Sequence, residues 1–413
     1  FGLDSRDNST GKGNQSDVIM IVNLNRETGE IKLASVFRDT YLNVSDKNTY
    51  NKINAAYAMG GPEQAVKALN KNLDLNITHY VAFNWKAVAT AINILGGVDI
   101  DISKSEFYYI NAFITETVKG TGIGSVQLKK AGVNHLDGVQ AVAYGRLRLM
   151  DSDYARTERQ RLVIQKAFEK AKKADFATLN SLIGNMSAMC ATNINMNDIL
   201  PMAKNVTKYH LGETTGFPAA RGEQKMKIGK LKLSCVIPQT LVSNVTSLHK
   251  FLYGEEDYKP SSTVQTISNK IAELTGLNKA GKEIDHVATD QGYIPKGETE
   301  ATTLSAEEES KQESQEESQM ESMLEESKKE SETGPDGKPI ETTSGAHNSG
   351  YLHETETDAN GNVIAKPTES HAGSPTDEAE TSMEAYRPSS PQDMTTEAPI
   401  GPGYEKSTAV PEA

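Results

Sequence analysis

The side chains best suited to chemistry gather in one short stretch of this sequence, residues 146–161. The stretch holds five arginines, which are Arg146, Arg148, Arg156, Arg159 and Arg161. A guanidinium keeps its positive charge at any working pH and binds two phosphate oxygens at once through parallel hydrogen bonds. The stretch is therefore a candidate binding site for an anion that carries phosphate.

The spacing of these arginines allows them to converge. If residues 144–149 are extended, Arg146 and Arg148 point to the same side, because side chains alternate along a strand. If a helix runs from about Arg156 to Ala174, Arg156 and Gln160 share one face at the head of an apolar stripe. The alternative is a solvated basic helix end, with scattered salt bridges to the acidic residues between the arginines.

Two aspartates stand where candidate strands end or begin. Asp4 follows the apolar start of the sequence, and Asp17 opens the next candidate strand. Two carboxylates from adjacent strands could hold Mg²⁺, which takes one or two carboxylates together with phosphate oxygens and water. The alternative is a pair of loop aspartates that only terminate strands.

Further polar residues follow the second candidate strand. Arg38 and Asp39 come directly after it, at the kind of strand end where sites are built. They could be a phosphate ligand beside an orienting acid, or a local ion pair in a turn. Lys52 lies near Asn54, which could be only a helix cap.

Strands alternate with helices along the first 150 residues. A hairpin is predicted from two longer strands, Asp17–Leu24 and Ile31–Phe37. Short strands are predicted at His79–Phe83 and Val98–Ile102, whereas residues 103–135 give no clear signal. Helices are predicted at Tyr50–Met59, at Pro62–Leu73, from a cap at Asn84 to Leu95, and from a cap at Asp137 to Tyr144. This alternation predicts an α/β fold in which helices are layered on a central mixed sheet.

The composition changes near residue 290. Residues 291–413 carry a formal charge of −19, so the first 290 carry +6 within the overall −13. Before that change, helical signals continue at Asn197–Tyr209, Leu241–Tyr253 and Ser262–Leu277. We expect one large domain over residues 1–277, a linker over 278–300, and a disordered acidic tail rich in Ser, Glu, Pro and Thr over 301–413. Such a tail cannot bury enough apolar surface to offset its chain entropy.

The basic charge of the first 290 residues favours an anionic partner. Nucleic acid is not expected, because the basic residues form one cluster without an aromatic platform or a recognition-helix pattern. The Gly-x-Ser-x-Gly, His-Glu-x-x-His and Gly-Lys-Ser/Thr motifs are absent, so serine-hydrolase, zinc-protease and P-loop chemistry find no support. The glycines of residues 120–124 lack the flanking strand and helix of a dinucleotide site and are expected to form a flexible loop.

Two features concern the cellular compartment. No run of eighteen apolar residues is present, so no membrane-spanning helix is expected within this sequence. The sequence begins Phe-Gly-Leu-Asp without an initiator methionine, and we expect a fragment whose upstream part could hold an anchor or a signal.

Cys190 and Cys235 could form one disulfide in an oxidising compartment or remain two buried thiols.

Seven blocks of sequence together resemble the LytR-CpsA-Psr family of cell-wall glycopolymer transferases. The blocks are Gly2-Leu-Asp-Ser-Arg6, Ser16-Asp-Val-Ile-Met20, Ser35-Val-Phe-Arg-Asp-Thr40, Lys52-Ile-Asn-Ala-Ala-Tyr57, Leu95-Gly-Gly-Val98, Ala143-Tyr-Gly-Arg-Leu-Arg148 and Asp153-Tyr-Ala-Arg-Thr-Glu-Arg-Gln160. They occur in the family's order and cover roughly residues 1–170. Each block alone is weak, but the ordered set is specific.

The resemblance implies an α-β-α domain that binds a glycopolymer linked to polyprenyl pyrophosphate, with the lipid in an apolar tunnel. It implies transfer of the glycan phosphate to peptidoglycan and release of polyprenyl phosphate. The implied location is the outer face of the cytoplasmic membrane of a Gram-positive cell, with an N-terminal anchor that this sequence lacks.

The resemblance also assigns roles to individual residues. The pyrophosphate ligands would be Arg6, Arg38, Lys52, Arg146, Arg148, Arg156 and Gln160. Asp4 and Asp17 would hold Mg²⁺, with Mn²⁺ as the alternative ion. The catalytic residues would be Arg38 together with Asp17 or Asp39, either of which could accept the proton of the acceptor hydroxyl.

The sequence departs from the family pattern at Gln15, where the family usually has arginine. Lys12 or Arg6 could replace the lost phosphate ligand. Two other functions stay open: a hydrolase that uses water as the acceptor at the same site, and a module that binds lipid pyrophosphate or the wall without turnover. Gln15 favours the binding module.

Overall fold

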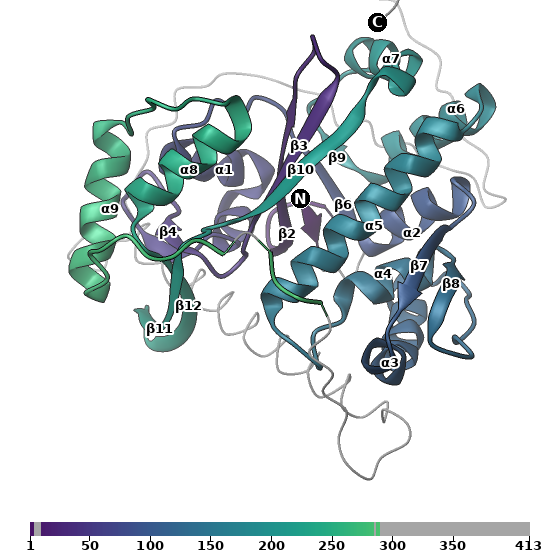
Figure 1. Ribbon diagram of the computed structural model, residues 1–413, viewed down its shortest axis with the longest axis horizontal. Coiled ribbons are helices and arrows are strands. Elements are labelled where there is room, and N and C mark those ends of the chain that lie inside the picture. Colours follow the sequence, from purple (N-terminus) through teal and green to yellow (C-terminus); the bar gives the residue numbers. More distant parts are fainter. Residues whose placement is uncertain (4–9, 285, 290–413) are drawn as a thin grey trace, which may run out of the picture. The chain divides into compact units, whose positions relative to one another are not determined.

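The protein folds as a layered α/β domain around a mixed sheet, as the alternation of strands and helices predicts. The computed structural model describes residues 1–3, 10–284 and 286–289 (Figure 1). The six-stranded sheet has the order β10-β3-β2-β1-β6-β9 and combines parallel with antiparallel pairs. Its strands are β1 (Gly2–Leu3), β2 (Ser16–Leu24), β3 (Glu30–Val36), β6 (Val81–Asn84), β9 (Ala191–Thr192) and β10 (His210–Phe217).

Helices lie on both sides of this sheet, and the described residues form two separate hydrophobic cores. The helices that contribute to the first core are α1 (Ala55–Leu73), α8 (Leu241–Tyr253) and α9 (Ser262–Thr275). The elements of the second core are α2 (Trp85–Ile94), β7 (Val98–Ile102), α3 (Lys104–Thr121), β8 (Gly132–Leu136), α4 (Gly138–Arg146) and α5 (Asp153–Lys173). Further along the chain come α6 (Phe176–Met189), α7 (Met196–Lys204) and the short helix η1 (Val206–Lys208). Figure 1 shows the two helical groups on opposite sides of the sheet.

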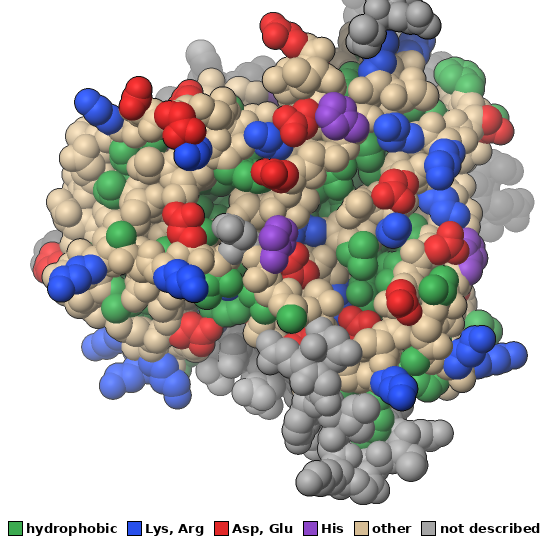
Figure 2. All heavy atoms as spheres, in the orientation of Figure 1, with side chains coloured by type: hydrophobic (Ala, Val, Ile, Leu, Met, Phe, Trp, Pro, Cys, Tyr) green, Lys and Arg blue, Asp and Glu red, His purple; other side chains and the backbone are tan. Residues whose placement is uncertain are grey.

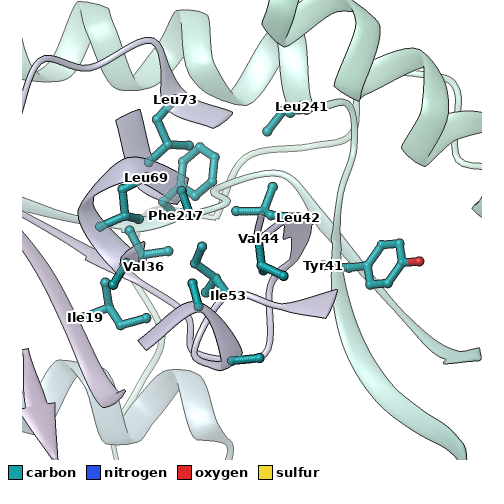
Figure 3. Close-up of a cluster of buried hydrophobic side chains, with 14 of the residues drawn as sticks. Ile19, Val36, Tyr41, Leu42, Val44, Ile53, Leu69, Leu73, Phe217 and Leu241 are labelled. Atoms are coloured by element: carbon teal, nitrogen blue, oxygen red, sulfur yellow. The ribbon is translucent and has the colours of Figure 1, made fainter. Parts of the chain in front are cut away.

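The β2–β3 hairpin follows from the alternation of its side chains. Ile19 pairs with Val36 and Ile21 with Ala34, and all four side chains are buried in the first core. Figure 3 shows Ile19 and Val36 beside one another in this core. The turn requires glycine at Gly29, where φ is 77° and an added Cβ would lie 2.4 Å from a facing backbone oxygen.

The two helix starts predicted from capping residues are confirmed. The Asn84 side chain accepts a hydrogen bond of 2.8 Å from the Ala87 amide at the start of α2. At the start of α4, Asp137 accepts from the Gln140 amide, and the Gln140 side chain accepts from the Asp137 amide. The first residue of each helix is therefore determined by capping hydrogen bonds between residues no more than three positions apart.

The helix predicted over residues 50–59 is wrong at its beginning. Tyr50–Lys52 is a strand, β5, which pairs antiparallel with β4 (Tyr41–Asn43). The α1 helix begins only at Ala55, and its backbone is not helical at Gly60 and Gly61, where the sequence predicts a break. The conformation of this segment is decided by its pairing with β4, whose residues lie seven to eleven positions upstream.

Two regions hold structure that the sequence did not indicate clearly. Residues 103–135 contain α3, whose start is closed by a capping box between Ser103 and Glu106, and most of β8. The expected loop at residues 120–124 begins only after α3, because Gly122 is the C-cap of that helix. Beyond the sheet, β11 (Arg221–Ile228) and β12 (Leu231–Pro238) form an antiparallel hairpin of their own.

Cys190 and Cys235 are free thiols, so the disulfide alternative is wrong. Burial raises the pKa of the Cys235 thiol to about 12 and that of Cys190 to about 11. Because the thiolate is the reactive form, both cysteines are expected to be inert at neutral pH.

A pair of glycine substitutions tests the packing of α4 on α2. An added Cβ at Gly138 would lie 1.9 Å from the Ala89 carbonyl oxygen, whereas one at Gly184, within α6, meets nothing within 4 Å. We expect Gly138→Ala to lower the free energy of unfolding by about 1–3 kcal/mol through overpacking. Gly184→Ala should raise it by about 0.5–1 kcal/mol, because alanine is the better helix former. Urea unfolding of both variants measures the difference, and a Gly138→Ala protein as stable as wild type would contradict the close approach.

Candidate anion-binding site

The carboxylate of Asp153, the first residue of α5, pairs with Arg156 and is influenced by three further cations. Arg156 Nη2 lies 2.8 Å from Asp153 Oδ1. Burial alone would raise the pKa of the Asp153 carboxyl, but the charges of Arg156, Arg38, Arg148 and Lys52 together lower it below its ordinary value. The charges of four residues predicted to bind phosphate therefore act on one carboxylate.

Arg38 and Lys52 are each held by an acid from a different segment. Arg38 lies two residues beyond the end of β3 and donates from Nη1 to Asp17 Oδ1, on β2, at 2.8 Å. Lys52, the last residue of β5, places Nζ 3.1 Å from Asp39 Oδ1. The Lys52 side chain is only 7% exposed, so its charge requires such a partner. The prediction that Arg38 and Asp39 stand at a strand end is confirmed.

Three arginines on α5 are buried rather than solvated. Arg156, Arg159 and Arg161 have 5%, 0% and 4% of their surface exposed. Each forms an ion pair with an acidic residue of the same stretch, as the solvated-helix alternative expected, but these pairs lie largely inside the protein. The interpretation of the stretch as a wet helix end is therefore wrong, and the helix starts at Asp153, behind the cap Ser152.

Arg159 is the centre of a buried ion-pair network that sequence reasoning did not assign. Its Nε donates to Glu106 Oε1 at 2.8 Å and its Nη1 to the Leu147 carbonyl oxygen at 3.0 Å, while Asp151 accepts from both Nη atoms. Glu106 also closes the capping box of α3 with Ser103. The spacing Ser103-x-x-Glu106 is a capping-box signal that could have placed Glu106 at a helix start, but nothing local links it to Arg159.

Arg146 and Arg148 do not lie on one extended segment. Arg146 is the last residue of α4, and Arg148 follows it in the turn before α5. The Arg146 guanidinium donates to Thr117 Oγ1 and Glu116 Oε2, both at 3.0 Å, and stacks 3.7 Å from the Trp85 ring. The prediction that Arg146 and Arg148 point to the same side of an extended segment is therefore wrong, since α4 continues through Arg146. The role of Arg146 as a phosphate ligand stays a prediction.

Gln160 connects α5 to the end of α4. Its Nε2 donates to the Gly145 carbonyl oxygen at 3.1 Å, one residue before Arg146. This contact agrees with the predicted helix face that carries Arg156 and Gln160. Whether the amide also binds phosphate stays a prediction.

Of the predicted metal ligands, the described residues include only Asp17. Asp4 and Arg6 lie outside the described residues. Within the part of the chain that the structure describes, no group of three or more His, Cys, Asp or Glu side chains could hold a metal ion. Mg²⁺ can take a single protein carboxylate and complete its ligands with phosphate oxygens and water, and the role of Asp17 as a metal ligand stays a prediction.

Gln15 occupies a buried position beside the cluster. Its Oε1 accepts a hydrogen bond of 2.8 Å from the Asn54 side chain, through Nδ2. The backbone N–H of Asn54 donates to the Arg38 carbonyl oxygen at 3.2 Å. The neutral amide is thus tied to the backbone of the cationic loop. Lys12, one of the two suggested replacements for the missing arginine, is exposed beside Gly61.

Comparison with known proteins identifies relatives of the first half of the chain. The LytR_cpsA_psr family matches residues 1–219. A Bacillus cereus protein named polyisoprenyl-teichoic acid–peptidoglycan teichoic acid transferase TagU is 32% identical over 213 residues, which are 50% of this chain and 62% of the relative. An uncharacterized protein of Staphylococcus aureus is 30% identical over 210 residues, 49% of each chain. The chain thus spans about half to three-fifths of the length of these relatives.

A solved structure supports the fold. An Enterococcus faecalis protein described as a transcriptional regulator superposes with a TM-score of 0.50 and 23% identity, over 68% of this chain and 94% of its own. At this identity the likeness concerns the fold alone. It agrees with the layered α/β architecture.

Removal of Arg159 tests the buried network. We expect Arg159→Met to lower the free energy of unfolding by about 3–5 kcal/mol, because Glu106 and Asp151 would keep buried charges without their cation. The matched control is Lys270→Met, which breaks an exposed pair with Glu273 and should change stability by no more than about 1 kcal/mol. Equal effects in chemical denaturation would contradict the network.

The charge of Asp153 gives a prediction for pH dependence. Because its folded-state pKa is lowered, its ionised form stabilises the fold above the unfolded pKa of about 3.9, and this contribution is lost as pH falls through the folded value. Asp153→Asn should therefore lower the Tm at pH 7, with a gap to wild type that shrinks below about pH 4. Asp198→Asn, another carboxylate in the first turn of a helix, is the control. A gap that stays constant in acid would contradict the assignment.

Proposed function

The chain belongs to the LytR-CpsA-Psr family, and from this we propose that it transfers a glycopolymer phosphate from a polyprenyl pyrophosphate carrier to peptidoglycan. The observation that carries the proposal is that the charges of Arg38, Lys52, Arg148 and Arg156 all act on the Asp153 carboxylate, which Arg156 contacts at 2.8 Å. A relative named as a teichoic acid transferase, similar over 50% of this chain, supports the substrate class.

The cationic cluster supplies what phosphoryl transfer requires. The acceptor hydroxyl oxygen attacks the glycan-side phosphorus, the bridging P–O bond breaks, and polyprenyl phosphate leaves. Negative charge on the phosphate oxygens is neutralised by guanidinium and ammonium groups that are already oriented, so no reorganisation is needed at the moment of reaction. Arg38 has the central role, because it lies at the strand end between Asp17 and the cations of α5.

Two carboxylates are candidates for the remaining chemistry. Asp17, with Asp4, would hold Mg²⁺, or Mn²⁺ in its place; when bound, such an ion neutralises charge on the two phosphates and aligns them. Asp39 is the better candidate to accept the proton of the acceptor hydroxyl, because a carboxylate that binds a metal is a poor base. The Asp39 side chain is 25% exposed beside Lys52, which leaves it accessible to an acceptor.

Apolar surface outside the two hydrophobic cores suits the lipid of the carrier. On β2, Val18, Met20 and Val22 alternate with the core residues, belong to neither hydrophobic core, and are partly or fully exposed, Val22 at 60%. The apolar helix α6 has no buried residue. Figure 2 shows hydrophobic side chains reaching the surface between charged ones on one face. A polyprenyl chain would cover such surface, which is otherwise unfavourable in water.

The proposed substrates place the protein at the outer face of the cytoplasmic membrane. There the lipid carrier meets peptidoglycan. Within residues 1–3, 10–284 and 286–289, no helix combines the length and the apolar character needed to cross a bilayer. The N-terminal anchor and the Gram-positive envelope stay predictions.

A transfer assay tests the proposal. The 413-residue protein is incubated with a polyprenyl pyrophosphate oligosaccharide and a peptidoglycan oligomer, with and without Mg²⁺, and products are identified by mass spectrometry. We expect glycan phosphate on the acceptor, and a loss of about 10²–10³-fold in kcat/KM for Arg38→Ala, since one charge-stabilising donor is removed. Arg26→Ala, an exposed arginine in the β2–β3 turn, is the matched control and should retain wild-type rates.

Other products would redirect the assignment. Free glycan phosphate without modified acceptor, even with several acceptors, would indicate a hydrolase. Unchanged substrate that remains bound to the protein would indicate the binding module that Gln15 favours. Equal rates for Arg38→Ala and Arg26→Ala would show that the chemistry takes place elsewhere.

A further inference from the structure

Arg221 packs against two aromatic rings that are next to site residues along the chain, although it lies beyond the residues that match the family. It is the first residue of β11, two positions after the family match ends at residue 219. Its guanidinium carbon lies 4.0 Å from the centre of the Tyr154 ring and 5.0 Å from that of Phe37. The two rings meet edge to face, with centres 4.7 Å apart. One cation therefore contacts a pair of rings that already touch each other.

Both rings are next to site residues along the chain. Phe37 immediately precedes Arg38, and Tyr154 immediately follows Asp153. Phe37 belongs to the segment after β3, whereas Tyr154 belongs to the first turn of α5. The contact between the rings therefore sets the separation of the two backbone segments that carry Arg38 and the Asp153–Arg156 pair.

Hydrogen bonds fix Arg221 and Tyr154 in this arrangement. Arg221 Nη1 donates to the carbonyl oxygens of Pro218, Ala219 and Ile284, at 3.4, 3.0 and 3.3 Å. The Tyr154 hydroxyl donates to Glu223 Oε1, also on β11, at 2.7 Å. The guanidinium thus has a defined orientation, and the tyrosine ring is held from its hydroxyl end as well as from its face.

We propose that Arg221 is a positioning residue for the anion-binding site, which acts through Phe37 and Tyr154 to hold Arg38 and the start of α5 at the separation that a diphosphate requires. The inference rests on the proposed function, but it assigns Arg221 no contact with substrate. It gives the β11–β12 hairpin a role in the site.

The test compares two cation–ring contacts of the same chain. Arg221→Met removes the cation next to the site. Lys32→Met is the matched control, because Lys32 Nζ lies 5.5 Å from the Phe251 ring and donates to the Phe251 carbonyl oxygen at 2.9 Å. Phe251 is on α8, a helix that carries no site residue. Arg221→Lys keeps a cation near the rings but loses the fork of donors. Melting curves identify a temperature at which all variants are folded.

At that temperature the binding of inorganic pyrophosphate to the full chain is measured by calorimetry. We expect Arg221→Met to weaken binding by about three- to ten-fold, Arg221→Lys to recover part of the loss, and Lys32→Met to bind within about two-fold of wild type. Hydrogen exchange should be faster in Arg221→Met at the amides of residues 37–39 and 153–157, and unchanged there in Lys32→Met. A purely structural role would lower the melting temperature without changing the affinity of the folded protein.

The outcomes separate this inference from the proposed function. If Arg38→Ala abolishes pyrophosphate binding while Arg221→Met binds like wild type, the inference is wrong and the proposed function stands. If wild type neither binds pyrophosphate nor transfers glycan, the proposed function is wrong. The exchange measurement then decides whether Arg221 holds the two segments, and unchanged exchange in Arg221→Met overturns that role as well.

Discussion

Positive charges brought together in a protein interior need negative partners, and this requirement organises the site. Arg38, Lys52, Arg156, Arg159 and Arg161 each form an ion pair with a carboxylate. Without those acids, the desolvation and mutual repulsion of the cations would oppose folding. With them, each of these cations has a carboxylate partner within ion-pair distance in the folded protein.

The same pairs hold the layers of the fold together at the site. Arg38 joins the end of β3 to β2 through Asp17, and Arg159 joins α5 to α3 through Glu106. The first connection lies within the central sheet, and the second lies within the helical layer that contains the other core. Asp153 lies between them, since it pairs with Arg156 on α5 and is influenced by Arg38 and Lys52 from the sheet side. Charges from elements of both hydrophobic cores therefore act on Asp153.

Paired cations also suit a site that must bind and release an anion. A guanidinium has five donors, and a bond to one carboxylate leaves others for phosphate oxygens. In the ligand-free state the carboxylates reduce the unfavourable free energy of buried, neighbouring cations. Their hydrogen bonds also fix the orientation of the buried guanidinium groups. The apolar surface of β2 and α6 lies outside both cores. The proposed function assigns the paired cations to the headgroup of the carrier and this surface to its lipid chain.

The sequence by itself determined those parts of the structure that depend on near neighbours. Alternating side chains and a turn glycine define the β2–β3 hairpin, and Asn84 and Asp137 define helix starts, because each of these signals acts within a few residues. The ordered Arg and Asp blocks also located the four cations whose charges act on Asp153. Two other residues of these blocks, Asp4 and Arg6, lie outside the described residues. Only the tertiary structure decided that Tyr50–Lys52 is a strand, that Arg146 forms an ion pair with Glu116, and that Arg159 forms one with Glu106. The partners in the Arg38–Asp17 and Arg159–Glu106 contacts are 21 and 53 residues apart. No local pattern encodes such a choice, because the energy of an ion pair depends on burial and distance, which exist only once the layers have packed.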